Sequence, residues 1–316
     1  MIGPDGTLGS AVLDSDRLRH VVFRSPPPAR PAAPDARARS ALSARQSVAA
    51  ASAPLSPSLS DFYERLFARS NLRADRYRET VLRRREGACL RALGVRDVTS
   101  ASALLDRDPA AVQRALQAVA IGVTSFFRDP MVFESLERPL REIAPTRPRG
   151  VRVLSVGCSD GRELYSMALL LDALAIPSAA LDGVDCRESA VRSASVGIYP
   201  TAELEAIPAT WRGDAFTPAG RLRPDVAQVR AEVRARCRWR VADAFALAAS
   251  GDYDVVLCRN LLIYLVPDAA AELWLRLRGM LAPGGVLVVG KAERPPSDAP
   301  LHRLAPCVYQ QRKPAR

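Results

Sequence analysis

The segment Val151-Arg-Val-Leu-Ser-Val-Gly157-Cys-Ser-Asp-Gly161-Arg-Glu163 decides the fold of this chain. It begins as an apolar strand and continues into a turn that has a glycine at each end. Glycine adopts left-handed conformations without strain and has no Cβ, so such a turn can approach a ligand closely. Residues 162–174 then have the composition of a helix. A buried strand, a tight turn and a helix predict an α/β unit.

The same alternation continues through the rest of the carboxyl-terminal half. Strands are predicted at residues 180–185, 252–260 and 285–293, with helices that start at about Glu188 and at Asp268. Strands and helices that alternate at this spacing predict a doubly wound parallel sheet. In such a sheet ligands bind beyond the carboxyl ends of the strands, at the point where the strand order reverses. We therefore expect the functional residues directly after the strands.

The residues after the first two strands predict a nucleoside-binding site. Asp185 ends the second strand, where a carboxylate can accept hydrogen bonds from both ribose hydroxyls of an adenosine. The dinucleotide motif G-x-G-x-x-G is absent, and so is the lysine of a phosphate-binding P-loop. A nucleoside cofactor without pyrophosphate fits better, and S-adenosylmethionine is the common one. From the pattern alone, other nucleotide-binding functions stay open.

The amino-terminal half divides into two segments of different composition. Residues 1–57 are rich in Pro, Ala, Ser and Arg, and this composition predicts a disordered segment. Residues 58–121 contain several amphipathic stretches, and Asp108-Pro109 is a typical helix start. These residues predict a small helical domain, followed by the α/β domain at residues 122–316.

The composition limits the partners, cofactors and location of the chain. Lys and Arg number 45 against 34 Asp and Glu, a formal net charge of +11 that favours acidic partners. The six cysteines are scattered without a C-x-x-C pair, and there are only two histidines, so no metal site is expected. Reduced thiols of this kind favour the cytoplasm. No run of 18 apolar residues exists, so no membrane span is predicted, and the amino terminus does not have the pattern of a secretory signal.

Five segments, in the correct order over about residues 61–312, resemble the CheR family, whose members methylate glutamate side chains of chemotaxis receptors. The segments of this chain that resemble the family's motifs are Val123-Thr-Ser-Phe-Phe-Arg-Asp129, GCSDGRELYSMA at 157–168, Asp185 with Gly197-Ile-Tyr199, LCRNLLIYL at 257–265, and Gly290-Lys-Ala-Glu293. The resemblance implies a helical amino-terminal domain and a Rossmann-like, S-adenosylmethionine-dependent methyltransferase domain. It also implies a short β-subdomain inserted at residues 199–240.

The resemblance also implies the site residues. Glu163 would pair with the ammonium group of the cofactor's methionine part, and Asp185 would bind its ribose. Arg128 would hold a carboxylate, either that of the cofactor or that of the substrate, and Tyr264 would orient the acceptor. The expected catalytic residues are Arg128 and Tyr264, and the expected cofactor contacts are Thr124, Arg128, Gly157, Glu163, Asp185, Asp243, Asn260 and Leu261.

The chain departs from the family pattern at several positions. Gly122, Arg162, Leu164, Asp243 and Lys291 stand where the family usually has Asn, Glu, Pro, Asn and His. The changes leave the main expected contacts in place and indicate a divergent branch.

The expected substrate is an acidic, helical protein of the chemoreceptor kind. A glutamate carboxylate, with an ordinary pKa of about 4.3, is ionised at neutral pH and needs no general base. The second helix of the amino-terminal part, predicted at about residues 75–93, is rich in arginine, and it is expected either to bind such a partner or to be a solvated face. Its arginines are Arg76, Arg78, Arg83, Arg84, Arg85 and Arg91.

Two alternatives to a protein-glutamate methyltransferase stay open. The chain could methylate a nucleic acid or a small acid, or it could be a non-catalytic scaffold that binds S-adenosylmethionine. A nucleic-acid partner is not expected, because Tyr77 is the only aromatic residue among these arginines.

Overall fold

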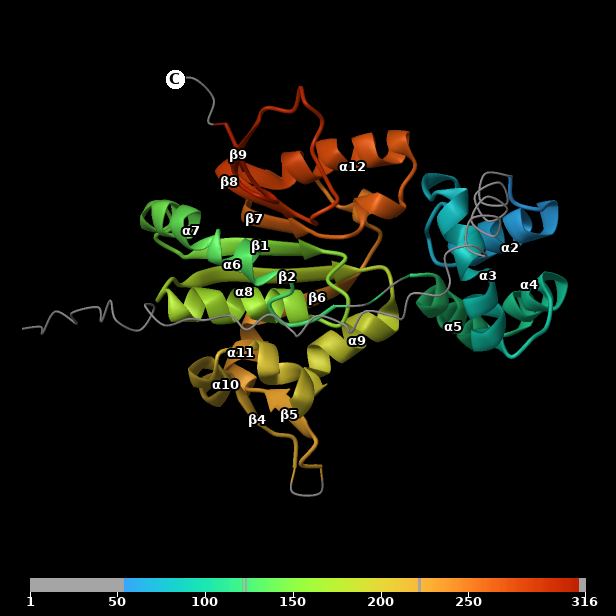
Figure 1. Ribbon diagram of the computed structural model, residues 1–316, viewed down its shortest axis with the longest axis horizontal. Helices are drawn as coiled ribbons and strands as arrows, with labels where there is room; N and C mark the ends of the chain where they lie inside the picture. Colours follow the sequence, from blue (N-terminus) through green and yellow to red (C-terminus); the bar gives the residue numbers. More distant parts are fainter. Residues whose placement is uncertain (1–53, 121, 123, 221–222, 313–316) are drawn as a thin grey trace, which may run out of the picture.

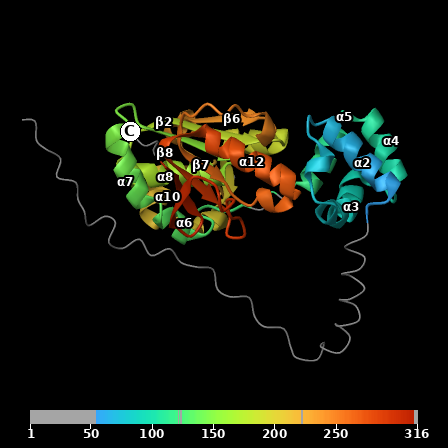
Figure 2. The ribbon, with the colours of Figure 1, turned by 90° about the horizontal axis from the view of Figure 1, so that it is seen from above.

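The computed structural model describes residues 54–120, 122, 124–220 and 223–312. The predicted disordered segment 1–57 lies outside these residues except for its last four. The described residues form two hydrophobic cores, one that ends at Val119 and one that begins at Phe126. Figure 1 shows the corresponding parts side by side, with the helical part at the right, and Figure 2 shows the same arrangement from above. On this ground we propose the domain boundaries 58–121 and 122–316.

The helical part consists of α2 (Pro57–Ala68), η2 (Ala74–Arg76), α3 (Glu79–Leu93), α4 (Val98–Arg107) and α5 (Pro109–Val119). Side chains cap three of these helices: Ser56 on α2, Asp97 on α4 and Asp108 on α5. The predicted start at Asp108-Pro109 is confirmed, because the Asp108 carboxylate accepts a hydrogen bond from the Ala110 amide at 2.8 Å.

The second predicted helix, placed at about residues 75–93, starts later than predicted. The backbone before α3 forms hydrogen bonds to the α/β part in place of helical ones. The Arg78 amide donates to the Tyr264 carbonyl at 2.9 Å, and the Val266 amide donates to the Arg76 carbonyl at 2.9 Å. Residues 76–78 therefore connect the two parts of the molecule and are not the first turn of a helix.

The α/β part contains a seven-stranded sheet with the strand order β6-β2-β1-β7-β8-β10-β9. Its first five strands in this order are parallel, whereas β10 is antiparallel to both β8 and β9. The predicted α/β class with a mostly parallel sheet is confirmed. The strands are β1 (Val151–Val156), β2 (Ser178–Asp185), β6 (Cys237–Val241), β7 (Tyr253–Cys258), β8 (Leu281–Val289), β9 (Leu301–Ala305) and β10 (Val308–Gln311).

The sheet has a switch point between β1 and β7, because one group of helices packs against β1, β2 and β6 and another group packs against β7 and β8. The helix α8 (Arg162–Ala173) contacts β1 and β2, and α9 (Glu188–Val196) contacts β2 and β6. On the other side, α12 (Pro267–Met280) contacts β7 and β8, and α7 (Glu137–Ile143) contacts β8. The short α6 (Pro130–Glu134) precedes α7. The strand order thus reverses at β1, where doubly wound sheets bind ligands.

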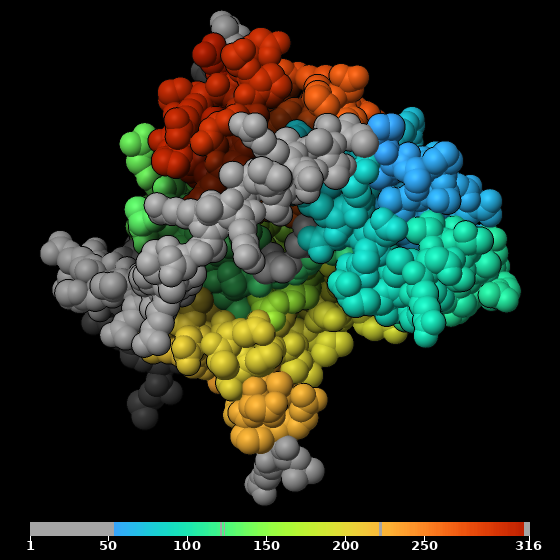
Figure 3. Space-filling model, turned by 45° about the vertical axis from the view of Figure 1, so that its right-hand side comes forward, coloured from blue at the N-terminus to red at the C-terminus, as the bar shows by residue number. Residues whose placement is uncertain are grey.

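A small second sheet lies between α9 and β6 in the chain. It has the order β3-β5-β4 and is antiparallel, with β3 (Ile198–Pro200), β4 (Phe216–Pro218) and β5 (Val226–Val229). The short helices α10 (Ala209–Ala215) and α11 (Ala231–Arg236) accompany it. In Figure 3 this insertion, coloured yellow to orange, projects from the body of the molecule.

The predicted insertion at residues 199–240 extends too far. Its last residues form β6, which pairs in parallel with β2 in the main sheet. Arg238 and Arg240 are exposed on this edge strand. Because an edge strand with two arginines has no continuous apolar run, its sequence does not show the pattern of a buried parallel strand.

Among the described residues, no helix is long and apolar enough to cross a membrane.

Candidate functional site

The residues that the sequence predicted for the site line one cavity. It lies where four neighbouring parallel strands end: Gly157 follows β1, Asp185 ends β2, Asp243 follows β6 and Asn260 follows β7. The helical part closes the cavity from the other side. The sequence-predicted residues that line it are Thr124, Arg128, Gly157, Glu163, Asp185, Asp243, Asn260, Leu261 and Tyr264. That they contact a cofactor stays a prediction.

The turn after β1 brings its backbone to the cavity. Gly157 and Gly161 have φ angles of 73° and 91°, in the left-handed region that favours glycine. At Gly161 a Cβ atom would also lie 2.8 Å from the Ala194 Cβ atom and from the ring of Trp239. The turn therefore requires glycine at this position for both conformation and space, and Gly161 leads directly into α8.

Glu163, in the first turn of α8, is a buried carboxylate with one partner on β1 and one directly after β7. It accepts a hydrogen bond from the Ser155 hydroxyl at 2.8 Å, and Arg259 lies 3.5 Å away. Burial raises the pKa of Glu163, while the charge of Arg259, the bonds from Ser155 and Arg259 and the charge of Arg128 oppose this rise. Arg259 itself is only 2% exposed and also binds Asp129 at 2.7 Å. The sequence did not single out Arg259 as a functional residue, although it lies inside the recognised segment 257–265.

Asp185 is held by four donors from two residues. Its two carboxylate oxygens accept hydrogen bonds from the Ser159 amide, the Arg187 amide and the Arg187 guanidinium, all between 2.9 and 3.1 Å. Asp185 is 5% exposed and Arg187 is 9% exposed. Sequence reasoning missed Arg187, because nothing in the residue order shows that this side chain folds back onto a carboxylate two positions earlier.

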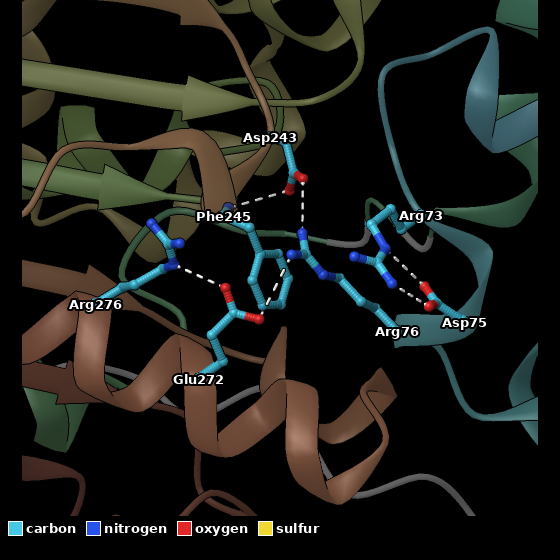
Figure 4. A network of polar contacts seen from close by, with 7 residues as sticks. All are labelled: Arg73, Asp75, Arg76, Asp243, Phe245, Glu272 and Arg276. Atoms are coloured by element: carbon cyan, nitrogen blue, oxygen red, sulfur yellow. Dashed lines mark hydrogen bonds and ion pairs between the residues drawn. The ribbon is translucent and has the colours of Figure 1, made fainter.

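Asp243 contacts both parts of the molecule (Figure 4). Its carboxylate accepts a hydrogen bond from the Phe245 amide at 3.2 Å and pairs with Arg76 at 3.3 Å. The same arginine lies over the Phe245 ring, 3.8 Å from its centroid, and 3.5 Å from Glu272 on α12. Burial raises the pKa of Asp243, and the bond from Phe245 and the charge of Arg76 act against this rise.

Glu293 fixes the loop after β7 through hydrogen bonds to backbone amides. This buried carboxylate accepts hydrogen bonds from the amides of Gly290 at 2.6 Å, Asn260 at 3.0 Å and Ile263 at 3.4 Å. Asn260 adopts a φ of 61°, and its side-chain oxygen is buried without a hydrogen-bond partner among the described residues. Leu261 packs beside Gly157, with 3.8 Å between its methyl carbon and the place of a Gly157 Cβ atom. The loop therefore brings to the cavity lining a residue whose side-chain oxygen has no hydrogen-bond partner among the described residues.

Thr124 and Arg128 line the cavity from the segment that joins the two parts. Arg128 lies close enough to Glu163 for its charge to lower the pKa of that carboxyl group. The two phenylalanines between them are almost completely buried and belong to the main core: Phe126 packs edge-on against Tyr199, and Phe127 against Phe133. Burial of these rings fixes the segment that carries Arg128.

The helical part supplies an apolar wall that the sequence did not predict. The wall residues are Phe67, Leu72, Tyr77, Val81, Leu82, Leu116 and Val119. Tyr77 stacks on Phe67 with 4.9 Å between the ring centroids and contacts both hydrophobic cores. In the sequence these residues look like ordinary apolar core positions, most of them on amphipathic helices, so nothing indicates that they also face a cavity.

The departures from the family pattern have distinct positions in the structure. Arg162 lies outside the cavity lining and binds Asp160 and Glu203, which connects α8 to the insertion. Leu164 is fully buried in the main core. Lys291 pairs with Asp129. Gly122 and Asp243 line the cavity, so only these two departures alter its surface.

The cavity fits a nucleoside cofactor with an amino-acid part. The unpartnered Asn260 oxygen can accept a hydrogen bond from an amino or ammonium group, and the buried Glu163 can pair with a positive charge. The apolar wall and Phe245 offer surface to a base. The described residues contain no group of three or more His, Cys, Asp or Glu side chains that could hold a metal ion.

Comparison with known proteins shows several relatives. A protein described as a probable biofilm formation methyltransferase, WspC, from Pseudomonas aeruginosa is 32% identical over 240 residues, covering 74% of this chain and 57% of that protein. The WspC of Pseudomonas putida is 36% identical over 190 residues, covering 57% of this chain and 43% of that protein. The chain thus spans about half the length of these two relatives. A chemotaxis protein methyltransferase of Listeria monocytogenes is 27% identical over 192 residues, covering 60% of this chain and 72% of that protein.

A family model matches the part of the chain that carries the cavity. The model is described as CheR methyltransferase, SAM binding domain, and it matches residues 122–307. This range includes every sequence-predicted site residue, and it is more than half of the 316 residues. The chain belongs to the CheR methyltransferase family.

Proposed function

We propose that this protein is an S-adenosylmethionine-dependent methyltransferase that methylates glutamate side chains of an acidic, helical protein of the chemoreceptor kind. One observation supports this most directly. Polar side chains from the ends of β1, β2, β6 and β7 meet around one cavity at the switch point of the sheet. The names of its relatives as chemotaxis and biofilm methyltransferases agree with this function.

The cofactor contacts follow from the chemistry of each group. Glu163 would pair with the ammonium group, and the unpartnered oxygen of Asn260 would accept from an amino group. Asp185 would bind the ribose, and Phe245 would contact the base. When bound, S-adenosylmethionine supplies a methyl group on a positively charged sulfur. Thr124, Gly157, Asp243 and Leu261 would complete the wall around it.

The acceptor requires no general base. A glutamate carboxylate is ionised at neutral pH, so the protein needs only to align it and to exclude water. The cavity lining accordingly offers no histidine among the described residues. Arg128 and Tyr264 both line the cavity and have donors suited to a carboxylate. In this proposal Arg128 holds a carboxylate with its planar guanidinium group, and Tyr264 orients the acceptor.

The surface for an acidic partner is smaller than the sequence predicted. Of the arginines proposed for docking, Arg76 binds Asp243 and Glu272, and the Arg78 side chain donates to the Leu265 carbonyl at 2.6 Å. Arg84 and Arg91 are exposed on α3 and lie seven positions apart, about two turns along one face. We propose these two as the docking charges. The reduced cysteines agree with a cytoplasmic location, which belongs to the same proposal.

The deciding experiment has two steps. Titration calorimetry with S-adenosylhomocysteine tests the cofactor site first. The protein is then incubated with methyl-labelled S-adenosylmethionine and lysate from its own source, and the labelled product is treated with mild alkali. A methyl ester on a carboxylate releases volatile methanol, whereas N-methyl products keep the label. Label that resists alkali, or that disappears on nuclease treatment, would contradict a glutamate acceptor. Binding of S-adenosylhomocysteine without transfer of label would support a non-catalytic scaffold, and absence of binding would contradict the cofactor site.

A matched pair of variants tests the docking charges. Replacement of Arg84 and Arg91 by alanine should reduce labelling severalfold and leave S-adenosylhomocysteine affinity unchanged, because neither residue lines the cavity. The control replaces Arg138 and Arg141 on α7, which removes the same charge at the opposite end of the molecule (Figure 1). Equal loss in both variants would show a general charge effect and no docking on α3.

A further inference from the structure

The carboxylate of Asp185 has no acceptor position left for a ribose. A carboxylate offers about four lone-pair positions, two on each oxygen. Oδ1 accepts from the amide and the Nε of Arg187, both at 3.0 Å. Oδ2 accepts from the Ser159 amide at 2.9 Å and from the guanidinium of Arg187 at 3.1 Å. As the structure stands, two ribose hydroxyls could not both donate to Asp185.

The Arg187 side chain accounts for one position on each oxygen. The other two positions are filled by backbone amides, whose places are fixed by the turn after β1 and by the start of α9. Removal of the side chain alone would free one lone pair on Oδ1 and one on Oδ2. Two neighbouring ribose hydroxyls need one acceptor position on each oxygen. The guanidinium therefore occupies the two acceptor positions that a ribose diol would use.

Gly122 makes room for the guanidinium in this position. A Cβ atom on Gly122 would lie 2.2 Å from one terminal nitrogen of Arg187 and 3.1 Å from the guanidinium carbon and from the other terminal nitrogen. No side chain at residue 122 is compatible with the present place of Arg187. Ser159 completes the enclosure, because its hydroxyl accepts from Arg187 at 3.1 Å and donates to the Gly122 carbonyl at 3.2 Å.

We propose that Arg187 is a specificity-determining residue that competes with the ribose of the cofactor for Asp185. The guanidinium keeps the buried carboxylate neutralised in the protein without cofactor, and it must leave Asp185 when a ribose diol binds. Binding of the nucleoside therefore includes the separation of a buried ion pair, which lowers the net gain from the two hydroxyls. This inference rests on the proposed cofactor site and assigns to Arg187 a role in setting its affinity.

Competition and simple structural support predict opposite results when Arg187 is removed. In Arg187→Ala the carboxylate keeps two open acceptor positions, so a ribose diol can bind without separation of an ion pair. Affinity for S-adenosylhomocysteine should rise about tenfold, which corresponds to about 1.4 kcal/mol. The melting temperature without ligand should fall, because a buried carboxylate loses its partner. If Arg187 only supported the site, affinity and melting temperature would fall together.

The ligand supplies a second test of the same point. An S-adenosylhomocysteine analogue whose ribose lacks both hydroxyls cannot compete for Asp185. The loss of affinity caused by removal of the hydroxyls should be small in the wild-type protein and at least fivefold larger in Arg187→Ala. An equal loss in both proteins would show that Arg187 does not occupy the place of the diol.

Gly122→Ala tests the proposal without removal of the arginine. The new methyl group should displace the guanidinium from Asp185, so affinity for S-adenosylhomocysteine should rise in the same direction as in Arg187→Ala. Arg192→Ala is the matched control, because Arg192 lies on the same helix, α9, and pairs with Glu188 at the surface. Its affinity should equal that of the wild type.

The experiment is titration calorimetry of the full chain and these three variants with both ligands, together with melting curves. Higher affinity in Arg187→Ala and Gly122→Ala, with no change in Arg192→Ala, supports competition. Equal or lower affinity in both site variants overturns it. If neither the wild type nor any variant binds S-adenosylhomocysteine, the proposed cofactor site fails. That result would also reject competition by Arg187. If the proteins bind S-adenosylhomocysteine but the affinity does not depend on Arg187, only the competition is rejected and the cofactor site stands.

Discussion

The guanidinium of Arg76 pairs with the carboxylate of Asp243 across the boundary between the helical part and the α/β part. Both side chains are largely buried, at 17% and 13% exposure, and Arg76 also covers the ring of Phe245 (Figure 4). Asp243 stands where the family resemblance leads one to expect an asparagine. An aspartate at this position gives Arg76 a charged partner. The resulting ion pair connects the cavity wall to the helical part.

We expect Arg76→Ala to destabilise this boundary. The change leaves Asp243 in a desolvated position without its cation and removes the contact with Phe245. The pair is less buried than a fully enclosed one and more buried than a surface pair, so the free energy of unfolding should fall by about 2 kcal/mol. Chemical denaturation measures this effect.

Arg73→Ala is the control for that variant. Arg73 lies three residues earlier and pairs with Asp75, and both side chains are more than half exposed. Its removal should change the free energy of unfolding by less than about 0.5 kcal/mol. A similar small effect for Arg76→Ala would show that the contact with Asp243 does not stabilise the boundary.

The pH dependence of cofactor binding should report on Glu163. Burial raises the pKa of this carboxyl group above its ordinary value. The ionised form binds an ammonium group, so affinity for S-adenosylhomocysteine is present above the folded pKa and is lost as the pH falls through it. The loss should therefore begin at a higher pH than for an exposed glutamate, whose pKa is about 4.3.

Calorimetric titrations between neutral and weakly acidic pH test this expectation. Glu163→Gln should bind more weakly at neutral pH and should lose most of the pH dependence. An equally steep pH dependence in Glu163→Gln would mean that another group titrates, and Glu163 would then not be the partner of the ammonium group.

The ends of the first two strands could be predicted from the sequence, because they depend on local patterns, whereas β7 ends two residues earlier than predicted and β8 lies about four residues before the predicted 285–293. Apolar runs and turn glycines placed β1, Asp185 ends β2 as expected, and Asn260 lies just after β7, at the expected edge of the sheet. The contacts that the sequence did not predict join residues far apart in the chain. Arg76 and Asp243 are separated by 167 positions, and no local pattern connects them.

The direction of individual side chains was the second feature that the sequence could not predict. Arg187 is two residues from Asp185, yet its return to that carboxylate depends on the space left by Gly122. The arginines at residues 76 and 78 read as part of a basic helix, although their backbone bonds to the α/β part. A run of charged residues predicts an exposed surface only where tertiary contacts do not involve the charges, and here Arg76 and Arg78 both make such contacts.

Arg128 provides a test of carboxylate geometry in the cavity. Its planar group can bind both oxygens of a carboxylate at once, whereas a lysine ammonium is a single compact charge. Arg128→Lys should lower methyl transfer by about tenfold, equivalent to about 1.4 kcal/mol in the barrier. Full activity in this variant would show that Arg128 contributes only a positive charge and does not bind both oxygens of a carboxylate.

Glu293 should control the shape of the loop that carries Asn260. Its carboxylate is 3% exposed and accepts from the amides of Gly290, Asn260 and Ile263. Glu293→Gln replaces one oxygen by an amino group, which cannot accept from these donors. At least one buried amide is then unsatisfied, at a cost of about 1–3 kcal/mol in unfolding free energy. Asn260 should also lose its left-handed conformation, and S-adenosylhomocysteine affinity should fall severalfold.

A second variant and a control separate this effect from a general loss of charge. At Gly290 a Cβ atom would lie 2.8 Å from a Glu293 oxygen and 2.9 Å from the Asn260 amide, so Gly290→Ala should disturb the same bonds while the carboxylate remains. Glu205 is exposed on the insertion, and Glu205→Gln removes the same charge with an expected change below about 0.5 kcal/mol. Weaker binding in Glu293→Gln and Gly290→Ala, but not in Glu205→Gln, would identify Glu293 as the positioning residue for Asn260. Unchanged affinity in both site variants would show that the loop keeps its shape without this carboxylate.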